Sequence, residues 1–185
     1  MMTAPEENQP HPGPPGAAPA ATVSRLMAGY AHGEEVPLGG YAVLAAVYAA
    51  GVGGFSLWVR ATGRRLPPSL PVTDLLLLAA AAHKGARVVT KDKITSFLRA
   101  PFTRRKEATT ASEVMDEPHG HGLRRATGEL LACPFCMSAW VAGALFCGYA
   151  AAPRATRLAA GGLTAVTIAD WLQYAWSLTQ EHAEG

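Results

Sequence analysis

The sequence predicts an all-α protein: a small polytopic transmembrane bundle of four helices, the second marginal, with a cytoplasmic amphipathic basic helix and a disordered N-terminal tail. Hydrophobic residues make up 49% of the 185-residue chain and charged residues only 16%, against about 25% charged in a typical soluble domain. The mean hydropathy is positive, at +0.11. The net charge of +2 excludes the strongly basic surface of a nucleic-acid-binding protein.

The four expected spans follow from the length of the apolar stretches. Residues 38–59 and 133–152 contain 22 and 20 residues without a charge, and about 20 helical residues cross a hydrocarbon core of roughly 30 Å. Residues 70–89 reach that length only by including charged side chains, which can extend to the membrane interface. A re-entrant or interfacial segment is the alternative there. Residues 158–178 form the last expected span, interrupted by Asp170.

The polar segments complete the expected organisation. Residues 1–37 are rich in Pro and Ala, lack the features of a signal peptide and are expected to be disordered. Residues 70–178 form the main membrane domain, with a loop at 90–132. In the four-span arrangement the side with this loop carries eleven Lys and Arg, and the other side five. The positive-inside rule therefore predicts a multi-pass plasma-membrane protein with this loop and the C-terminus in the cytoplasm.

A short amphipathic helix is expected within the central loop, because Ile94, Phe97 and Leu98 share one helical face. Basic residues lie beside it at Lys91, Lys93, Arg99, Arg104, Arg105 and Lys106. One interpretation is a lipid-facing basic helix that recognises anionic headgroups. The other is a determinant of topology that only keeps this loop in the cytoplasm.

The Cys133-Pro-Phe-Cys136 motif stands at the start of the third expected span. A helix N-terminus lowers a thiol pKa, as a redox pair requires. However, the motif lacks the βαβ context of a glutaredoxin-like site, and cytoplasmic thiols are kept reduced. We therefore favour a reduced pair that caps or packs the helix. His119 and His121 could join both cysteines in a tetrahedral zinc site, although the spacing matches no standard zinc finger.

Asp170 is a carboxylate within an expected span, and such residues face the bundle interior or a polar cavity. It lies about 18 Å from the outer end of its helix, and His83 and Lys84 lie about 20 Å from Leu70 on theirs. Because these depths match, we predict an ion pair between Asp170 and Lys84, His83 or Arg87. In one alternative, the Asp170 carboxyl group is hydrogen-bonded by neighbouring hydroxyls or is protonated. In the other, Asp170 acts in a proton relay.

Four motifs, taken in order, resemble a known bacterial family. They are DLLLL at residues 74–78, RVVTKDKIT at 87–95, LRAPF at 98–102 and GELLACPFC at 128–136. Together they resemble the bacterial domain-of-unknown-function family 1360 (DUF1360), over about residues 70–175. The resemblance implies a small integral membrane protein, with a sporulation label on some relatives. It implies no activity, cofactor or catalytic residue.

The expected function is therefore that of a non-enzymatic structural, adaptor or interaction protein of the bacterial plasma membrane. No nucleophile elbow, phosphate-binding loop or dinucleotide motif appears in the sequence. No cofactor and no nucleic acid are expected, and the expected partners are membrane lipids, with anionic lipids as candidates for the basic helix. The alternative is a membrane thiol-disulfide oxidoreductase that uses Cys133 and Cys136. A transporter component has only Asp170 and its polar helix face in its favour.

Overall fold

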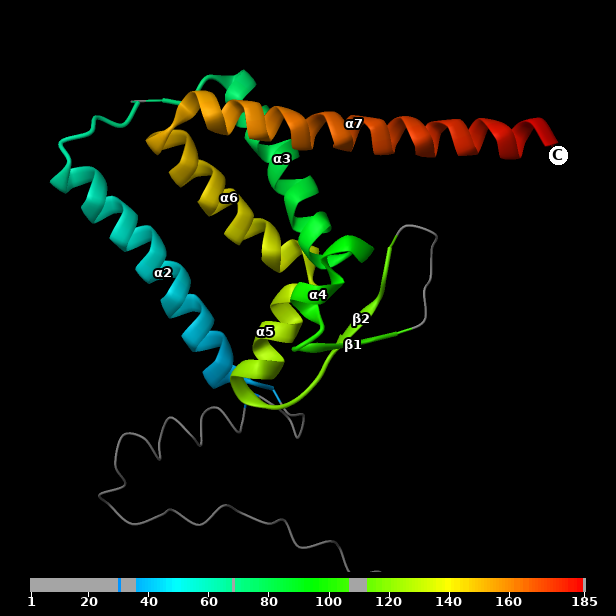
Figure 1. Ribbon diagram of the computed structural model, residues 1–185, viewed down its shortest axis with the longest axis horizontal. Helices are drawn as coiled ribbons and strands as arrows, with labels where there is room; N and C mark the ends of the chain where they lie inside the picture. Colours follow the sequence, from blue (N-terminus) through cyan, green and yellow to red (C-terminus); the bar gives the residue numbers. More distant parts are fainter. Residues whose placement is uncertain (1–29, 31–35, 68, 107–112, 185) are drawn as a thin grey trace, which may run out of the picture. The chain divides into compact units, whose positions relative to one another are not determined.

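The computed structural model of the chain describes residues 30, 36–67, 69–106 and 113–184, so nearly all of the expected tail lies outside the described residues. The chain divides into two units, Met1–Val36 and Pro37–Gly185. The elements of the second unit, in chain order (Figure 1), are α2 (Leu38–Ala61), α3 (Val72–Thr90), the 3-10 helix η1 (Lys93–Thr95), α4 (Ser96–Arg99), β1 (Thr103–Arg105), β2 (Asp116–Pro118), α5 (Gly122–Ala132), α6 (Pro134–Ala151) and α7 (Pro153–Glu184).

Among the described residues, α2 and α6 are the two helices long and apolar enough to cross a membrane. They contain 24 and 18 residues, which correspond to about 36 and 27 Å at 1.5 Å per residue. Only 6% of the apolar stretch of α2 and 11% of that of α6 are buried inside the protein. Most residues of α2 are exposed, whereas most residues of α6 are partly buried against its neighbours.

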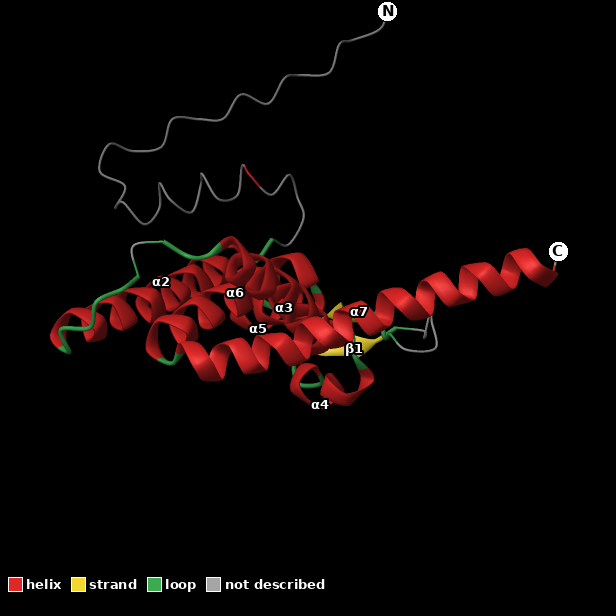
Figure 2. Ribbon diagram, turned by 90° about the horizontal axis from the view of Figure 1, so that it is seen from above, coloured by secondary structure: helices red, strands yellow, loops and turns green. Residues whose placement is uncertain are grey.

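The second and fourth expected spans correspond to α3 and α7, which are more polar. Three charged residues interrupt α3, namely Asp74, Lys84 and Arg87, and neither helix is among the candidate spans. The structure therefore supports two candidate spans where the sequence predicts four. Helix α7 is also longer than the predicted 158–178, because it begins at Pro153, a residue favoured in the first turn. Its C-terminal half runs beyond the other elements of this unit (Figures 1 and 2).

Helix α3 lies at the centre of the packing and contacts both α6 and α7. The backbones of α3 and α6 approach closely at Gly85, where a Cβ atom would lie 2.9 Å from Cγ1 of Val141. The buried core lies where the first half of α3 meets the C-terminal end of α6 and the N-terminal part of α7, and it consists of Leu78, Ala81, Tyr149 and Ala160.

The segment predicted as a loop, residues 90–132, is largely folded. In place of one amphipathic helix, the chain forms η1 and the four-residue α4. An antiparallel hairpin follows, with Thr103 opposite Pro118 and Arg105 opposite Asp116. The unit is therefore mostly helical rather than all-α. Strands of three residues are too short to show the alternation from which a strand is predicted.

Helix α5 completes this segment and packs against α2 and β2. A Cβ atom on Gly40 of α2 would lie 2.6 Å from Cβ of Ala126 on α5, so the small residue is required for this contact. The hydroxyl of Tyr41 also donates a hydrogen bond to Glu129. The most N-terminal described helix is thereby held by a segment that follows it by 88 residues.

Candidate functional site

A polar cavity of about 760 Å³ lies between the C-terminal half of α3, η1 and the middle of α7. Lys84 Nζ, from α3, lies 2.9 Å from Asp170 Oδ2, from α7. The Lys84 side chain is 12% exposed and that of Asp170 is 42% exposed. The structure thus brings Asp170 together with Lys84, one of the three partners predicted from helix depth.

The other two predicted partners, His83 and Arg87, line the same cavity. Arg87 forms an ion pair with Glu113 instead. Trp171 and Tyr174 form part of the wall contributed by α7. The charged side chains that line the cavity balance, with three cations and three carboxylates: Lys84, Arg87 and Lys93, and Asp92, Glu113 and Asp170.

A second charged cluster, which the sequence did not reveal, joins α3, α6 and α7 at their other end. Arg157 donates from Nε to Asp74 Oδ1 at 2.9 Å and from a terminal nitrogen to Asp74 Oδ2 at 2.6 Å. The same terminal nitrogen lies 2.8 Å from the hydroxyl oxygen of Tyr149, which donates to Asp74. Asp74 and Tyr149 are buried. The sequence feature that could have indicated this cluster is the position of Asp74 and Arg157, which both lie near the expected outer ends of their predicted spans.

Arg99 is fully buried rather than lipid-facing, which corrects its assignment to the basic helix. Its guanidinium donates to Asp116 Oδ2 at 2.6 Å and to Thr95 Oγ1 at 2.8 Å. It also donates to the carbonyl oxygens of Val89 at 2.7 Å and Asp92 at 3.0 Å. Arg99 therefore ties the end of α3, η1, α4 and β2 into one cap, and we call residues 91–106 and 113–132 the cap below.

The remaining residues of the predicted basic helix do not share one helix. Arg104 and Arg105 lie on β1 and Lys106 follows it, all three exposed. Lys93 is exposed on η1, and Lys91 Nζ lies 3.8 Å from the sulfur of Met115. The apolar side chains of Ile94, Phe97 and Leu98 are exposed. The cap thus presents apolar and basic side chains together, but from three different elements.

Cys133 occupies the N-cap position of α6, where its sulfur accepts a hydrogen bond of 3.3 Å from the backbone N–H of Cys136. Both cysteines and Cys147 are free thiols. Burial acts to raise the pKa of Cys133. Hydrogen bonds from Cys136 and Phe135 and the charge of Lys91 outweigh burial and lower that pKa below its usual range. The sequence motif is therefore a helix cap with an acidified thiol.

The four residues of the alternative zinc site are not brought together. His119 and His121 precede α5 and Cys133 follows it, so the 11 residues of this helix separate them by about 16 Å. Arg124 lies instead within 3.0 Å of His119 Nε2. In the described part of the chain, no group of three or more His, Cys, Asp or Glu side chains could hold a metal ion.

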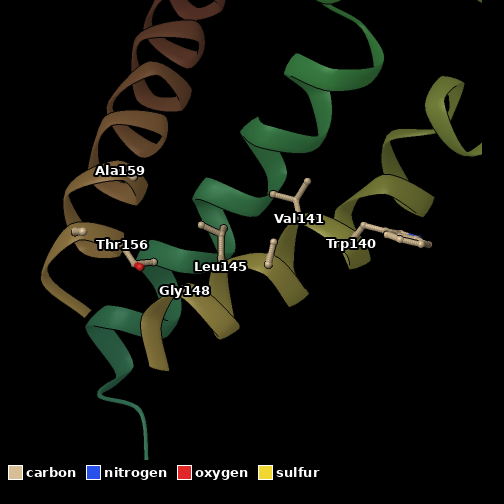
Figure 3. Close-up of a pocket in the computed structure, with 8 residues that line it drawn as sticks. Trp140, Val141, Leu145, Gly148, Thr156 and Ala159 are labelled. Carbon is tan, nitrogen blue, oxygen red and sulfur yellow. The ribbon is translucent and has the colours of Figure 1, made fainter. Parts of the chain in front are cut away.

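An apolar groove of about 540 Å³ lies between α6 and α7. It is drawn in Figure 3, where Gly148 of α6 lies beside Thr156 of α7, whereas Trp140 projects from α6 on the side away from α7. No charged side chain lines this groove. It therefore offers packing surface but no group for acid–base or nucleophilic chemistry.

The family described as "Protein of unknown function (DUF1360)" matches residues 77–176, more than half of the chain. The chain belongs to this family. Sporulation protein YjcA of Bacillus subtilis (strain 168) is 34% identical over 110 residues, which cover 54% of this chain and 93% of that protein. No solved structure matches the chain.

The DUF1360 region contains nearly all of the features described above. It holds the charged residues of the polar cavity, the Arg99 network, the Cys133–Cys136 motif at the start of α6 and the whole of α6. Helix α2 and Asp74 precede the matched residues. The polar cavity therefore belongs to the family region, whereas the ion pair between Arg157 and Asp74 joins that region to a residue just before it.

Proposed function

We propose that this DUF1360 protein is a multi-pass protein of the bacterial plasma membrane that acts as a non-enzymatic scaffold or adaptor. One observation carries the proposal: α2 and α6 are long and apolar enough to span a bilayer, and only 6% and 11% of their apolar stretches are buried within the protein. Exposure of apolar surface to water costs about 25 cal/mol per Å². Lipid removes that cost for a helix whose backbone hydrogen bonds are satisfied internally.

We extend this topology to four spans by including α3 and α7. Charged residues are tolerated in a span when they pair with one another within the bundle. Lys84 of α3 pairs with Asp170 of α7, and Asp74 of α3 pairs with Arg157 of α7. Each helix thus supplies partners for the charges of the other, which supports an arrangement in which α3 and α7 enter the membrane together.

The cap is then cytoplasmic, because the segment between α3 and α6 carries eight of the 16 lysine and arginine residues and the adjoining end of α3 adds Lys84 and Arg87. Its internal network around Arg99 makes it a folded surface rather than a flexible loop. The exposed Ile94, Phe97 and Leu98 lie close in the chain to Lys93 and to the basic β1. Such a surface suits contact with anionic lipid headgroups or with a protein partner at the membrane.

The proposed role includes no catalysis. The sulfur of Cys133 is engaged as a helix cap, and the described residues contain no metal cluster. The name of the Bacillus subtilis relative refers to a process, sporulation, rather than to a reaction. That name agrees with a structural role, and we carry no further property of that protein over to this chain.

The proposal is tested by carbonate extraction together with thiol labelling in intact cells. We expect the full chain to stay in the membrane pellet. The thiols at Cys133 and Cys136 should react only with a membrane-permeant maleimide, and without prior reduction. In a Ser69→Cys variant, the new thiol between α2 and α3 should react with an impermeant maleimide.

Two results would contradict the proposal. Release of the chain by carbonate would remove the membrane topology. Labelling of Cys133 only after treatment with a reductant would show a disulfide at the α6 cap and would favour the thiol-disulfide oxidoreductase. A Cys147→Ser variant serves as the control, because it removes the thiol within α6 and leaves the motif intact.

A further inference from the structure

The polar cavity lies at the depth of a lipid headgroup in the proposed topology, on which this inference rests. Lys84 precedes the end of α3 at Thr90 by six residues, or about 9 Å of helix. The polar layer of a bilayer is roughly 5–8 Å thick on each side of the hydrocarbon core. The residues Asp92, Lys93 and Ile94 close the cavity at the cap. The cavity thus spans the boundary between headgroups and acyl chains.

Two cations on α3 form the half of the cavity suited to a phosphate. Lys84 and Arg87 are three residues apart and therefore share one face of the helix. The amine of Lys84 is mostly buried, and its contact with a phosphate oxygen would be shielded from water. Charge-assisted hydrogen bonds of this kind are the strongest that side chains form with phosphate.

The half of the cavity on α7 suits a positive group. The carboxylate of Asp170 is bound to Lys84 through one oxygen but remains 42% exposed. Trp171 and Tyr174 lie beside it in the cavity wall, and aromatic faces attract ammonium groups. Trp171 is also 70% exposed, so this wall continues onto the outward-facing surface of α7, where an acyl chain can lie.

We propose that this cavity binds the phosphoethanolamine headgroup of a phospholipid, a zwitterion with one phosphodiester and one ammonium group. The phosphate lies against Lys84 and Arg87 and shares these cations with their ion-pair partners Asp170 and Glu113. The ammonium lies against Asp170 and Trp171. The three cations and three carboxylates of the cavity leave no net charge for an anionic ligand to neutralise. An anionic phosphoglycerol headgroup would satisfy only the α3 half and would leave Asp170 facing a neutral hydroxyl.

The test is native mass spectrometry of the full chain in detergent with equal amounts of phosphatidylethanolamine and phosphatidylglycerol that carry the same acyl chains. We expect the wild type to retain phosphatidylethanolamine about tenfold more strongly, the effect of roughly one additional charge-assisted contact. Asp170→Asn should remove the preference. Lys84→Gln should weaken the retention of both lipids.

The matched control is Arg65→Gln, a loss of one positive charge at an exposed position between α2 and α3, which should leave the preference unchanged. If Lys84→Gln does not fold, the exchange variant Lys84→Asp/Asp170→Lys keeps the ion pair while moving the cation to α7. It should fold and lose the preference. A further arm adds glycerophosphoethanolamine, the headgroup without acyl chains. If this soluble headgroup binds as tightly as the lipid, the cavity recognises phosphoethanolamine, but the proposal that a membrane lipid supplies it is overturned.

Equal retention of the two lipids by the wild type would overturn the inference, as would a loss in Arg65→Gln equal to that in Lys84→Gln. These failures are distinct from failure of the proposed function. A chain that resists carbonate extraction but shows no preference for phosphatidylethanolamine would refute only the headgroup assignment. A chain released by carbonate would refute the membrane topology itself.

Discussion

Replacing Arg99 by lysine should destabilise the cap although the positive charge is retained. The guanidinium of Arg99 makes five hydrogen bonds of 2.6–3.2 Å and is fully buried. A lysine ammonium has three donors on one nitrogen, so at least two partly buried acceptors lose their partner. Each unsatisfied acceptor costs about 1–3 kcal/mol. We expect Arg99→Lys to lower the free energy of unfolding by about 2–6 kcal/mol.

The measurement is thermal or denaturant unfolding of the full chain in detergent, combined with hydrogen exchange of the cap. The backbone amides of η1, α4 and the hairpin should lose protection before those of α6. The matched control is Arg104→Lys, the same chemical change at an exposed position on β1, which should alter stability by less than about 0.5 kcal/mol. Equal stability of the two variants would refute the assignment of Arg99 as the residue that holds the cap together.

Three further predictions concern the helices and the thiols. Asp74→Asn and Arg157→Gln should each lower the unfolding temperature in detergent. The double variant should lose less stability than the two single variants added together, because the two residues share one hydrogen-bonded cluster. Strictly additive losses of stability would count against the pair. Gly85→Ala should destabilise the bundle by about 1–3 kcal/mol through overpacking of α3 on α6. Gly54→Ala on α2 should not, because a new Cβ there meets no atom within 4 Å. The two variants are compared in the same unfolding assay. The rate of iodoacetamide alkylation of Cys133, followed by peptide mapping across pH, should reach its midpoint at a lower pH than that of glutathione. The reason is that the pKa of Cys133 is lowered, so that the reactive thiolate persists to lower pH. A midpoint at or above that of glutathione would contradict the capping geometry.

The features predicted correctly from the sequence depend on helix length and rise alone. The long uncharged stretches at α2 and α6 are visible without knowledge of the fold, because the thickness of a bilayer sets their length. The approach of Lys84 and Asp170 also follows from depth arithmetic, since each residue advances a helix by 1.5 Å. Helix rise sets the depth of each side chain, whereas their contact also requires α3 and α7 to be neighbours, which the structure shows.

The role of Arg99 could not be predicted in the same way. In the sequence it resembles the other basic residues of its segment. Its burial depends on carbonyl oxygens of Val89 and Asp92 that converge only after α3 ends and η1 turns back. Helix α5, by contrast, left a signal that was overlooked: Leu123, Ala126 and Leu130 fall on one helical face. Its low average hydrophobicity made the segment resemble a loop.

The docking of α2 on α5 has a consequence for the order of events during synthesis. The partners of Tyr41 and Tyr48 follow them by 88 and 91 residues. At the usual elongation rate of roughly 5–20 residues per second, the ribosome needs about 4–18 s to make that intervening chain. Through this interval α2 has emerged but has none of its native neighbours, and its small-residue surface around Gly40 stays uncovered. An insertase or chaperone that shields one apolar helix has this window in which to act.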